Sequence, residues 1–229
     1  MLLLAVDAAG PNCAVALAAG QGAASRILAS TTERVDRGHA EHLMPMIEAT
    51  LARSGLSYAD LDRIAVTTGP GSFTGVRVGI AAARALALAL ELPTVGVGSL
   101  AAVAFDALQK HATGTAVAAL DATRSEVYVR IVDIASGAVQ VEACAMAIED
   151  VVAMMSHAEP PILLAGSGAA AIASMLTDLE TCVTHTLDAP DISAVAFLGL
   201  LDDAVSPPVP FYGRGADAKP QLGKAVARA

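Results

Sequence analysis

The segment whose residues are best suited to bind a ligand is glycine-rich. It covers residues 69–79 and reads Gly-Pro-Gly-Ser-Phe-Thr-Gly-Val-Arg-Val-Gly. Its glycines permit a sharp turn with exposed N–H groups, and it opens a predicted helix, a geometry that favours anions. A P-loop requires Lys and then Ser or Thr after its last glycine, whereas Val-Arg follows Gly75. The segment therefore has two alternative interpretations. It contacts a phosphate, or it is a structural strand-to-helix turn in which Ser72 or Thr74 caps the helix.

Two histidines and a serine offer other chemistry. His39 and His42 have a spacing that can place two metal ligands on one helical face, but no Cys or carboxylate clearly completes a set. The alternative is that the two histidines cap the start of the helix and are polar residues of the surface. Ser167 lacks the Gly-x-Ser-x-Gly spacing of a nucleophile elbow, and no Asp and His follow it in a persuasive order. We predict no catalytic residue and no metal site.

Hydrophobic periodicity and turn residues predict the elements that position these groups. The predicted strands are residues 2–8, 13–18, 25–32, 63–68, 94–97, 115–121, 126–134, 138–143, 162–165 and 182–184. The predicted helices are residues 40–53, 76–90, 99–111 and 148–157, one ending near 179, and residues 192–205.

The two halves of the chain repeat one pattern. Residues 4–8 (Leu-Ala-Val-Asp-Ala) correspond to residues 118–122 (Ala-Ala-Leu-Asp-Ala), and residues 65–72 correspond to 163–168. Each half has three strands, a helix, a strand, a Gly-x-Gly turn and a helix. We therefore predict a duplicated α/β lobe, in which an antiparallel meander is extended by parallel strands.

Lobes of this kind face each other across a cleft. Asp7 and Asp121 each end the first strand of a lobe, so both are expected to look into that cleft. We predict an N-terminal lobe at residues 1–108, a C-terminal lobe at residues 109–215 and a flexible basic tail at residues 216–229.

The duplicated lobe, the strand-end aspartates and the Gly-x-Gly turns resemble the two-lobed fold of actin, Hsp70 and sugar kinases, which is ribonuclease H-like. Within that superfamily, residues 69–79 resemble the signature of the TsaB family, bacterial subunits of the machinery that makes threonylcarbamoyladenosine in tRNA. Further matches cover nearly the whole chain, at residues 42–45, 95–100, 120–128 and 212–219.

The resemblance implies a subunit that is not catalytic alone but binds and positions the catalytic TsaD subunit. TsaD would transfer threonylcarbamoyl to the adenosine beside the anticodon, the ATPase TsaE would be a further partner, and tRNA would be reached through the complex. Without a partner, a homodimer is expected. TsaD carries a His-x-x-x-His metal pair where this chain has Ser99 and Val103, so no metal is implied here.

Kinases of this superfamily use strand-end acids to bind Mg²⁺ through water. A small kinase or nucleotide hydrolase using Asp7 and Asp121 is therefore the alternative function, while capping and turn hydrogen bonds are the structural alternative for both acids. Since no hydroxyl directly follows Asp7, we expect no cofactor on the chain alone, and ATP or ADP with Mg²⁺ only in the complex. The residues of such a nucleotide site would be Asp7, Gly69, Gly71, Ser72, Asp121, Gly166 and Gly168.

Helix 76–90 carries small residues at every fourth position, which permits close approach of another backbone. It is apolar nearly all round, so it needs cover on several sides. The neighbour is either another helix of this chain or another subunit, and the resemblance favours a subunit docked on helices 40–53 and 75–90. The predicted residues of the TsaD or homodimer interface are His42, Met46, Gly75, Val76, Gly79, Ala83 and Ala87.

Charge and composition exclude several classes. The 229 residues have a net charge of −9, which argues against unaided binding of nucleic acid, and 55% are hydrophobic, which excludes general disorder. The three cysteines match no zinc or redox motif, and no leader or membrane span is evident, so we expect a cytoplasmic protein.

Residues 213–229 carry a net charge of +3, which suits either contact with tRNA or a solubilising end. Residues 207–210 are expected to be extended and docked on the second lobe.

Overall fold

The computed structural model describes residues 1–20, 22–35, 38–123, 125–176, 180–185, 188–202 and 207–213. The predicted basic tail, with Arg214 and all residues after it, lies outside the described residues.

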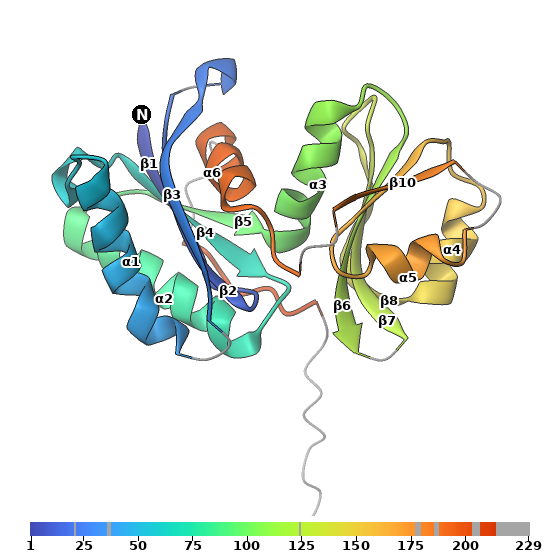
Figure 1. The fold of residues 1–229 in the computed structure, drawn as a ribbon, viewed down its shortest axis with the longest axis horizontal. Helices are drawn as coiled ribbons and strands as arrows, with labels where there is room; N and C mark the ends of the chain where they lie inside the picture. The colour runs from blue at the N-terminus through green and yellow to red at the C-terminus, as the bar shows by residue number, and fades with distance from the viewer. Residues whose placement is uncertain are drawn as a thin grey trace, which may run out of the picture.

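Two mixed five-stranded sheets form the frame, as the repeat predicts (Figure 1). In each, an antiparallel meander is extended by two parallel strands. The first sheet has the order β3-β2-β1-β4-β5, with β1 Leu2–Asp7, β2 Asn12–Ala19, β3 Arg26–Arg34, β4 Arg63–Gly69 and β5 Thr94–Gly98. The second has the order β10-β9-β6-β7-β8, with β6 Thr115–Thr123, β7 Glu126–Asp133, β8 Val139–Ala147, β9 Ile162–Ala165 and β10 Thr181–His185.

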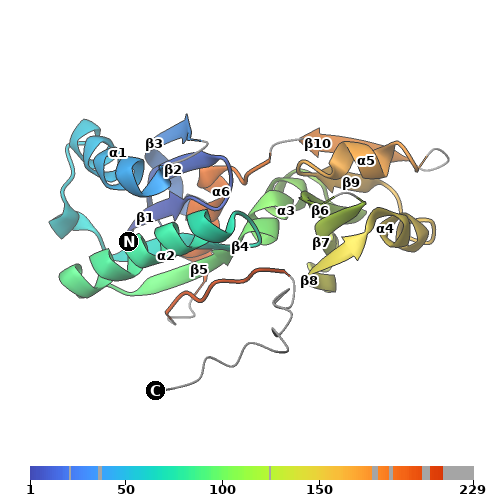
Figure 2. The ribbon, with the colours of Figure 1, turned by 90° about the horizontal axis from the view of Figure 1, so that it is seen from below.

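Helices cover both faces of both sheets, so that layers of helix and sheet alternate across the molecule (Figure 1). The helices are α1 His39–Arg53, α2 Phe73–Leu90, α3 Ser99–Lys110, α4 Ile148–Met155, α5 Ala169–Ala173 and α6 Ile192–Leu201. By length and composition α2 is apolar enough to cross a membrane, but in this fold it lies along the first sheet (Figure 2). The helix expected to end near residue 179 is shorter than predicted, since α5 ends at Ala173.

The central layer exchanges helices between the halves of the chain. α6, from the second half, packs on the first sheet, and its Gly199 lies against Ala65 with no room for a side chain. α3, which follows β5, packs on the second sheet through Leu100 and Val103. The two helices meet where the rings of Phe105 and Phe197 lie 6.1 Å apart. A boundary at residue 108 therefore does not separate two independent packing units.

The proline-rich run that follows α6 was predicted to dock on the second lobe, but it docks on the first. Pro208 is buried against β5, where a side chain at Gly96 would lie 3.3 Å from the Pro208 Cβ. Gly96 leaves room for this approach because it has no Cβ. Residues beyond this run reach the second lobe.

Candidate functional site

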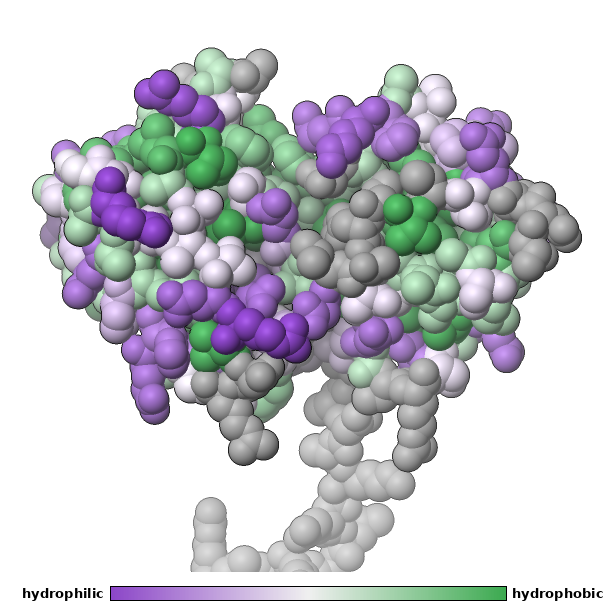
Figure 3. Space-filling model, in the orientation of Figure 1, coloured by the Kyte–Doolittle hydropathy of each residue, from purple (hydrophilic) through white to green (hydrophobic). Residues whose placement is uncertain are grey.

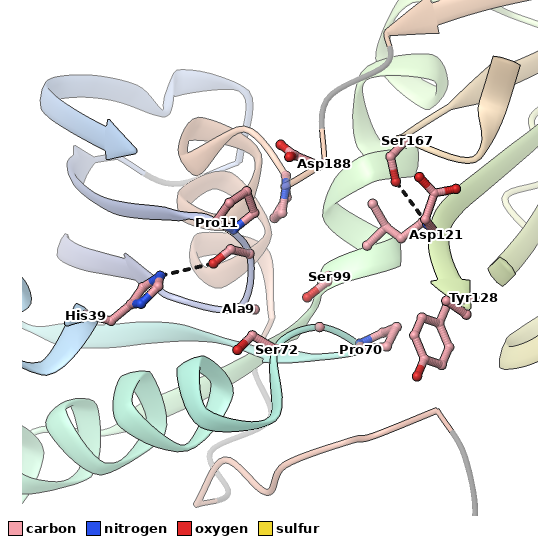
Figure 4. A pocket seen from close by; sticks show the side chains of 15 residues that line it. Ala9, Pro11, His39, Pro70, Ser72, Ser99, Asp121, Tyr128, Ser167 and Asp188 are labelled. Atoms are coloured by element: carbon pink, nitrogen blue, oxygen red, sulfur yellow. Dashed lines mark hydrogen bonds between the residues drawn. The ribbon is translucent and has the colours of Figure 1, made fainter. Parts of the chain in front are cut away.

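A crevice of about 420 Å³ lies between the lobes, where β1, β4 and β6 end (Figure 4). It is lined by Ala9, Gly10, Pro11, His39, Pro70, Gly71, Ser72 and Ser99 of the first lobe, by Leu120, Asp121, Ala122, Tyr128 and Ser167 of the second, and by Asp188 and Pro190. Of the predicted nucleotide set, this brings Gly71, Ser72 and Asp121 together. The other four predicted residues, Asp7, Gly69, Gly166 and Gly168, do not line the crevice.

Asp7 does not look into the crevice, because its side chain is fully buried. Its Oδ1 accepts hydrogen bonds from the Thr67 hydroxyl at 2.5 Å and from the Ala9 N–H at 2.9 Å, while its Oδ2 has no hydrogen-bonding partner among the described residues. Burial raises the pKa of this carboxyl, against the opposing effect of the Thr67 bond. A buried carboxyl that favours the proton does not suit water-mediated Mg²⁺ binding.

Asp121, its counterpart in the repeat, is exposed and lines the crevice. The backbone N–H of Asp121 donates to the Ser167 Oγ at 2.9 Å, which ties the end of β6 to the turn after β9 (Figure 4). Ser167 thus has a structural contact where nucleophilic chemistry was considered. The repeat preserves the residue type of the two aspartates but not their surroundings.

The glycine-rich turn packs against the loop that follows β1. The Ser72 N–H donates to the Ala9 carbonyl at 2.6 Å, and the Ser72 Oγ accepts from the Gly75 N–H at 3.2 Å and caps α2. A Cβ at Gly71 or Gly75 would collide with the carbonyl oxygens of Ala9 and Ala8. Two N–H groups considered for an anion therefore serve the fold, which supports the structural role of this turn.

Two pairs of positions that could be compared with metal ligands, His39 with His42 and Ser99 with Val103, lack the arrangement of a metal site. His39 Nε2 lies 3.1 Å from the Gly10 carbonyl, while His42 Nδ1 lies 3.9 Å from Glu33, so the two rings serve different neighbours. Ser99 and Val103 lie a helical turn apart and are fully buried. The Ser99 hydroxyl is a weak metal ligand, and Val103 has no ligand atom. Within the described ranges, no group of three or more His, Cys, Asp and Glu side chains could hold an ion.

Ser99 also lines the crevice, a position that the sequence does not predict for it. It begins α3 and is fully buried, and its Oγ has no hydrogen-bonding partner in the described part of the chain. Figure 4 shows it between the two walls. The sequence signalled only that a serine can begin a helix, and burial of the hydroxyl follows from packing between the lobes.

The predicted small-residue stripe faces inward, so most of the predicted interface set is covered by this chain itself. Gly75, Val76, Gly79 and Ala83 are buried, and Gly79 lies against β4 and the loop after β1, where a Cβ would be 3.4 Å from Val66 and 3.6 Å from Ala8. Met46 and Ala87 also belong to the core beneath α1 and α2. Only His42 of that set is exposed. The close approach predicted for a subunit is therefore made by the first sheet.

The outward face of α2 carries a different stripe, with helical spacings of four and three residues. It consists of Phe73, Arg77, Ala81, Ala85 and Leu88, which are all exposed. Phe73 is 55% exposed and Leu88 is 83% exposed, high fractions for large apolar side chains. Together with the neighbouring α1, this stripe forms what we call the helical face. Apolar and hydrophilic residues are mixed on the side of the first lobe seen in Figure 3.

Two duplicated sheets with an intervening crevice define the actin-like, ribonuclease H-like class of two-lobed proteins. A family model described as "TsaD: tRNA N6-adenosine threonylcarbamoyltransferase" matches residues 25–200. The chain therefore belongs to this family, and within it to the TsaB group, as the following relatives show.

The TsaB protein of Escherichia coli, described as a tRNA threonylcarbamoyladenosine biosynthesis protein, is 41% identical over 128 residues. This match covers 56% of the chain and 53% of the relative, so the chain spans about half the length of that protein. Bacillus subtilis TsaB is 28% identical over 230 residues, 96% of each protein. A solved Pseudomonas aeruginosa structure, described as similar to peptidase YEAZ, has a TM-score of 0.71 at 28% identity and covers 93% of this chain and 99% of its own.

Proposed function

We propose that this chain is a non-catalytic subunit in the synthesis of threonylcarbamoyladenosine in tRNA, and that it binds and positions a catalytic TsaD subunit. The names of the TsaB relatives support the pathway. The buried Asp7, the turn N–H groups bonded within the fold and the unsuitable Ser99–Val103 pair support the absence of chemistry on this chain. The chain would act in the cytoplasm and reach tRNA through the complex.

The exposed stripe of α2 carries this proposal. Ala81 and Ala85 leave the helix backbone accessible between Phe73 and Leu88, so another helix could approach closely and cover the two large side chains. Burying such apolar surface against a partner is favourable at roughly 25 cal/mol per Å² before the costs of association. The same helical face would pair two copies of this chain when TsaD is absent, and TsaE would join through the complex.

The docking test compares alanines that differ in where they face. Ala85→Glu places a charge on the exposed stripe and is expected to weaken TsaD binding at least about tenfold in calorimetry. Ala153→Glu makes the same change on the exposed side of α4 in the other lobe and should leave the affinity unchanged. Equal affinities for the wild type and both variants would remove the helical face from the proposal.

The kinase alternative has less support from the geometry, because it needs Asp7 as a group that reaches bound Mg²⁺ and this carboxyl is buried. We propose that ATP or ADP with Mg²⁺ binds only in the assembled complex. Calorimetry of the isolated chain with Mg-ATP separates the two. Tight binding with turnover, abolished in Asp7→Asn, would favour the enzyme, whereas no heat of binding agrees with the subunit.

A further inference from the structure

The segment at residues 207–213, which we call the strap, runs from the first lobe to the second (Figure 2). Its Pro208 is buried against β5. The Phe211 N–H donates to the Thr68 carbonyl of β4 at 2.8 Å, and two residues later the Gly213 carbonyl accepts from the Ala145 N–H of β8 at 3.2 Å. One short stretch of backbone is thus hydrogen-bonded to an element of each sheet.

Glycines allow the strap to pack closely against both lobes. Gly69, with φ of +99°, lies so close to the Phe211 carbonyl that a Cβ there would collide with it. Gly213, with φ of +69°, lies on the Tyr128 ring, where a Cβ would be 2.6 Å from the ring carbons. The Pro70 Cβ also lies near Gly213, at 3.4 Å from the same position. Tyr128 and Pro70 also line the crevice, one from each lobe, so Gly213 of the strap lies beside a residue of each wall.

Tyr212 connects the strap to the exposed stripe of α2. Its hydroxyl accepts a hydrogen bond from Arg77 Nε at 2.8 Å, and its ring centroid lies 5.0 Å from that of Phe73, at an interplanar angle of 35°. The Arg77 guanidinium carbon lies 3.7 Å from the Phe73 ring centroid. Contacts of this kind hold aromatic and cationic side chains in defined orientations. Two of the five stripe residues therefore owe their orientation to Tyr212.

The lobes have a second attachment, the α3–α6 contact with its Phe105–Phe197 pair. An attachment at one place leaves two packed bodies able to rotate about it, whereas a second attachment at another place removes that freedom. The strap meets β4 and β8, away from the α3–α6 contact (Figure 2). Its placement suits it to fix the angle between the lobes.

We infer that the strap locks the two lobes together and that Tyr212 is a positioning residue for the partner-facing end of α2. The first part concerns this chain alone. The second part rests on the proposed function, because it takes the exposed stripe as the surface that TsaD contacts. Release of the strap would free the lobes and disorder Phe73 and Arg77 at the same time.

Amide hydrogen exchange on the full chain tests the lock with two glycines of matched conformation. Gly213→Ala places a Cβ against Tyr128, whereas Gly55→Ala, at φ of +67°, places one in open space. We expect Gly213→Ala to speed exchange at least about tenfold in peptides covering residues 73–80 and 143–147, with no change from Gly55→Ala in those peptides. Faster exchange confined to residues 207–213 would overturn the lock.

A milder pair keeps the test valid if Gly213→Ala fails to fold. Tyr212→Phe removes only the hydroxyl that Arg77 bonds, and Tyr58→Phe removes a hydroxyl without a hydrogen-bonding partner among the residues described. Only Tyr212→Phe should speed exchange at residues 73–80 and weaken TsaD binding, by about threefold to tenfold. Faster exchange with unchanged TsaD affinity would overturn the positioning role. Absence of TsaD binding by the wild type would instead refute the proposed function, and the exchange data would still decide the lock.

Discussion

The Thr67 hydroxyl donates a 2.5 Å hydrogen bond to the Asp7 carboxyl inside a site of the first lobe that is closed to solvent. β1 and β4 are parallel neighbours, and this bond joins the last residue of β1 to the side chain of β4 that lies next to it. A position that suggested metal chemistry in the sequence thus holds the first sheet together at its crevice end. The consequences can be measured as stability.

Asp7 should make the folded state less stable as pH rises. Below the ordinary pKa of 3.8 both states carry the proton, so pH has no effect through this group. Above it the unfolded chain releases the proton while the folded chain retains it, because burial raises the folded pKa, so the free energy of unfolding falls until the folded pKa is passed. Asp7→Asn should lose this dependence in urea titrations from pH 4 upward, whereas Asp150→Asn, an exposed change on α4, should keep it. An unaltered pH profile in Asp7→Asn would contradict this account.

Removing the hydroxyl of Thr67 should harm the protein more than removing that of Ser99. Thr67→Val takes a donor from buried Asp7 and is expected to lower the free energy of unfolding by about 1–3 kcal/mol. Ser99→Ala removes a buried hydroxyl that lacks a partner in the described residues, so it should be neutral or stabilising by up to about 1 kcal/mol. Urea denaturation of both variants gives the comparison, and equal losses would refute it.

Ser72, rather than Thr74, should be the residue that stabilises the start of α2. Its Oγ accepts from the Gly75 N–H, so Ser72→Ala is expected to cost about 1 kcal/mol. Thr74 is exposed within the first turn, and Thr74→Ala should change stability by less than about 0.5 kcal/mol. Thermal unfolding distinguishes the two, and a larger loss from Thr74→Ala would show that the cap is assigned to the wrong residue.

The inward glycines of α2 should differ in their tolerance of a methyl group. At Gly75 a Cβ would collide with the Ala8 carbonyl, so Gly75→Ala should destabilise the fold by about 1–3 kcal/mol. At Gly79 the nearest atom would be a Val66 methyl at 3.4 Å, and the gain in helix propensity, about 1 kcal/mol, opposes the crowding. Denaturant titration should therefore place Gly79→Ala within about 1 kcal/mol of the wild type, and a loss equal to that of Gly75→Ala would contradict the packing.

The sequence predicted the elements and the duplicated sheets well, because period and turn residues are local signals. It could not tell which neighbour the Gly75–Gly79–Ala83 stripe would meet, since small residues permit close approach to a sheet as well as to a helix. Nor could it separate Asp7 from Asp121, which end equivalent strands but differ in burial. Burial there depends on the loop after β1 and on Thr67, which are brought together only by tertiary structure.

The exchange of α3 and α6 also bears on how the protein is made. While a ribosome synthesises the chain, the first sheet is finished at β5, yet the helix that covers its second face is encoded almost a hundred residues later. In the finished fold Leu3, Ala5 and Val95 pack with α6, so they lack that cover throughout this interval. A nascent first half therefore presents a bare apolar surface, which makes it a natural client for chaperones at the exit tunnel until α6 emerges.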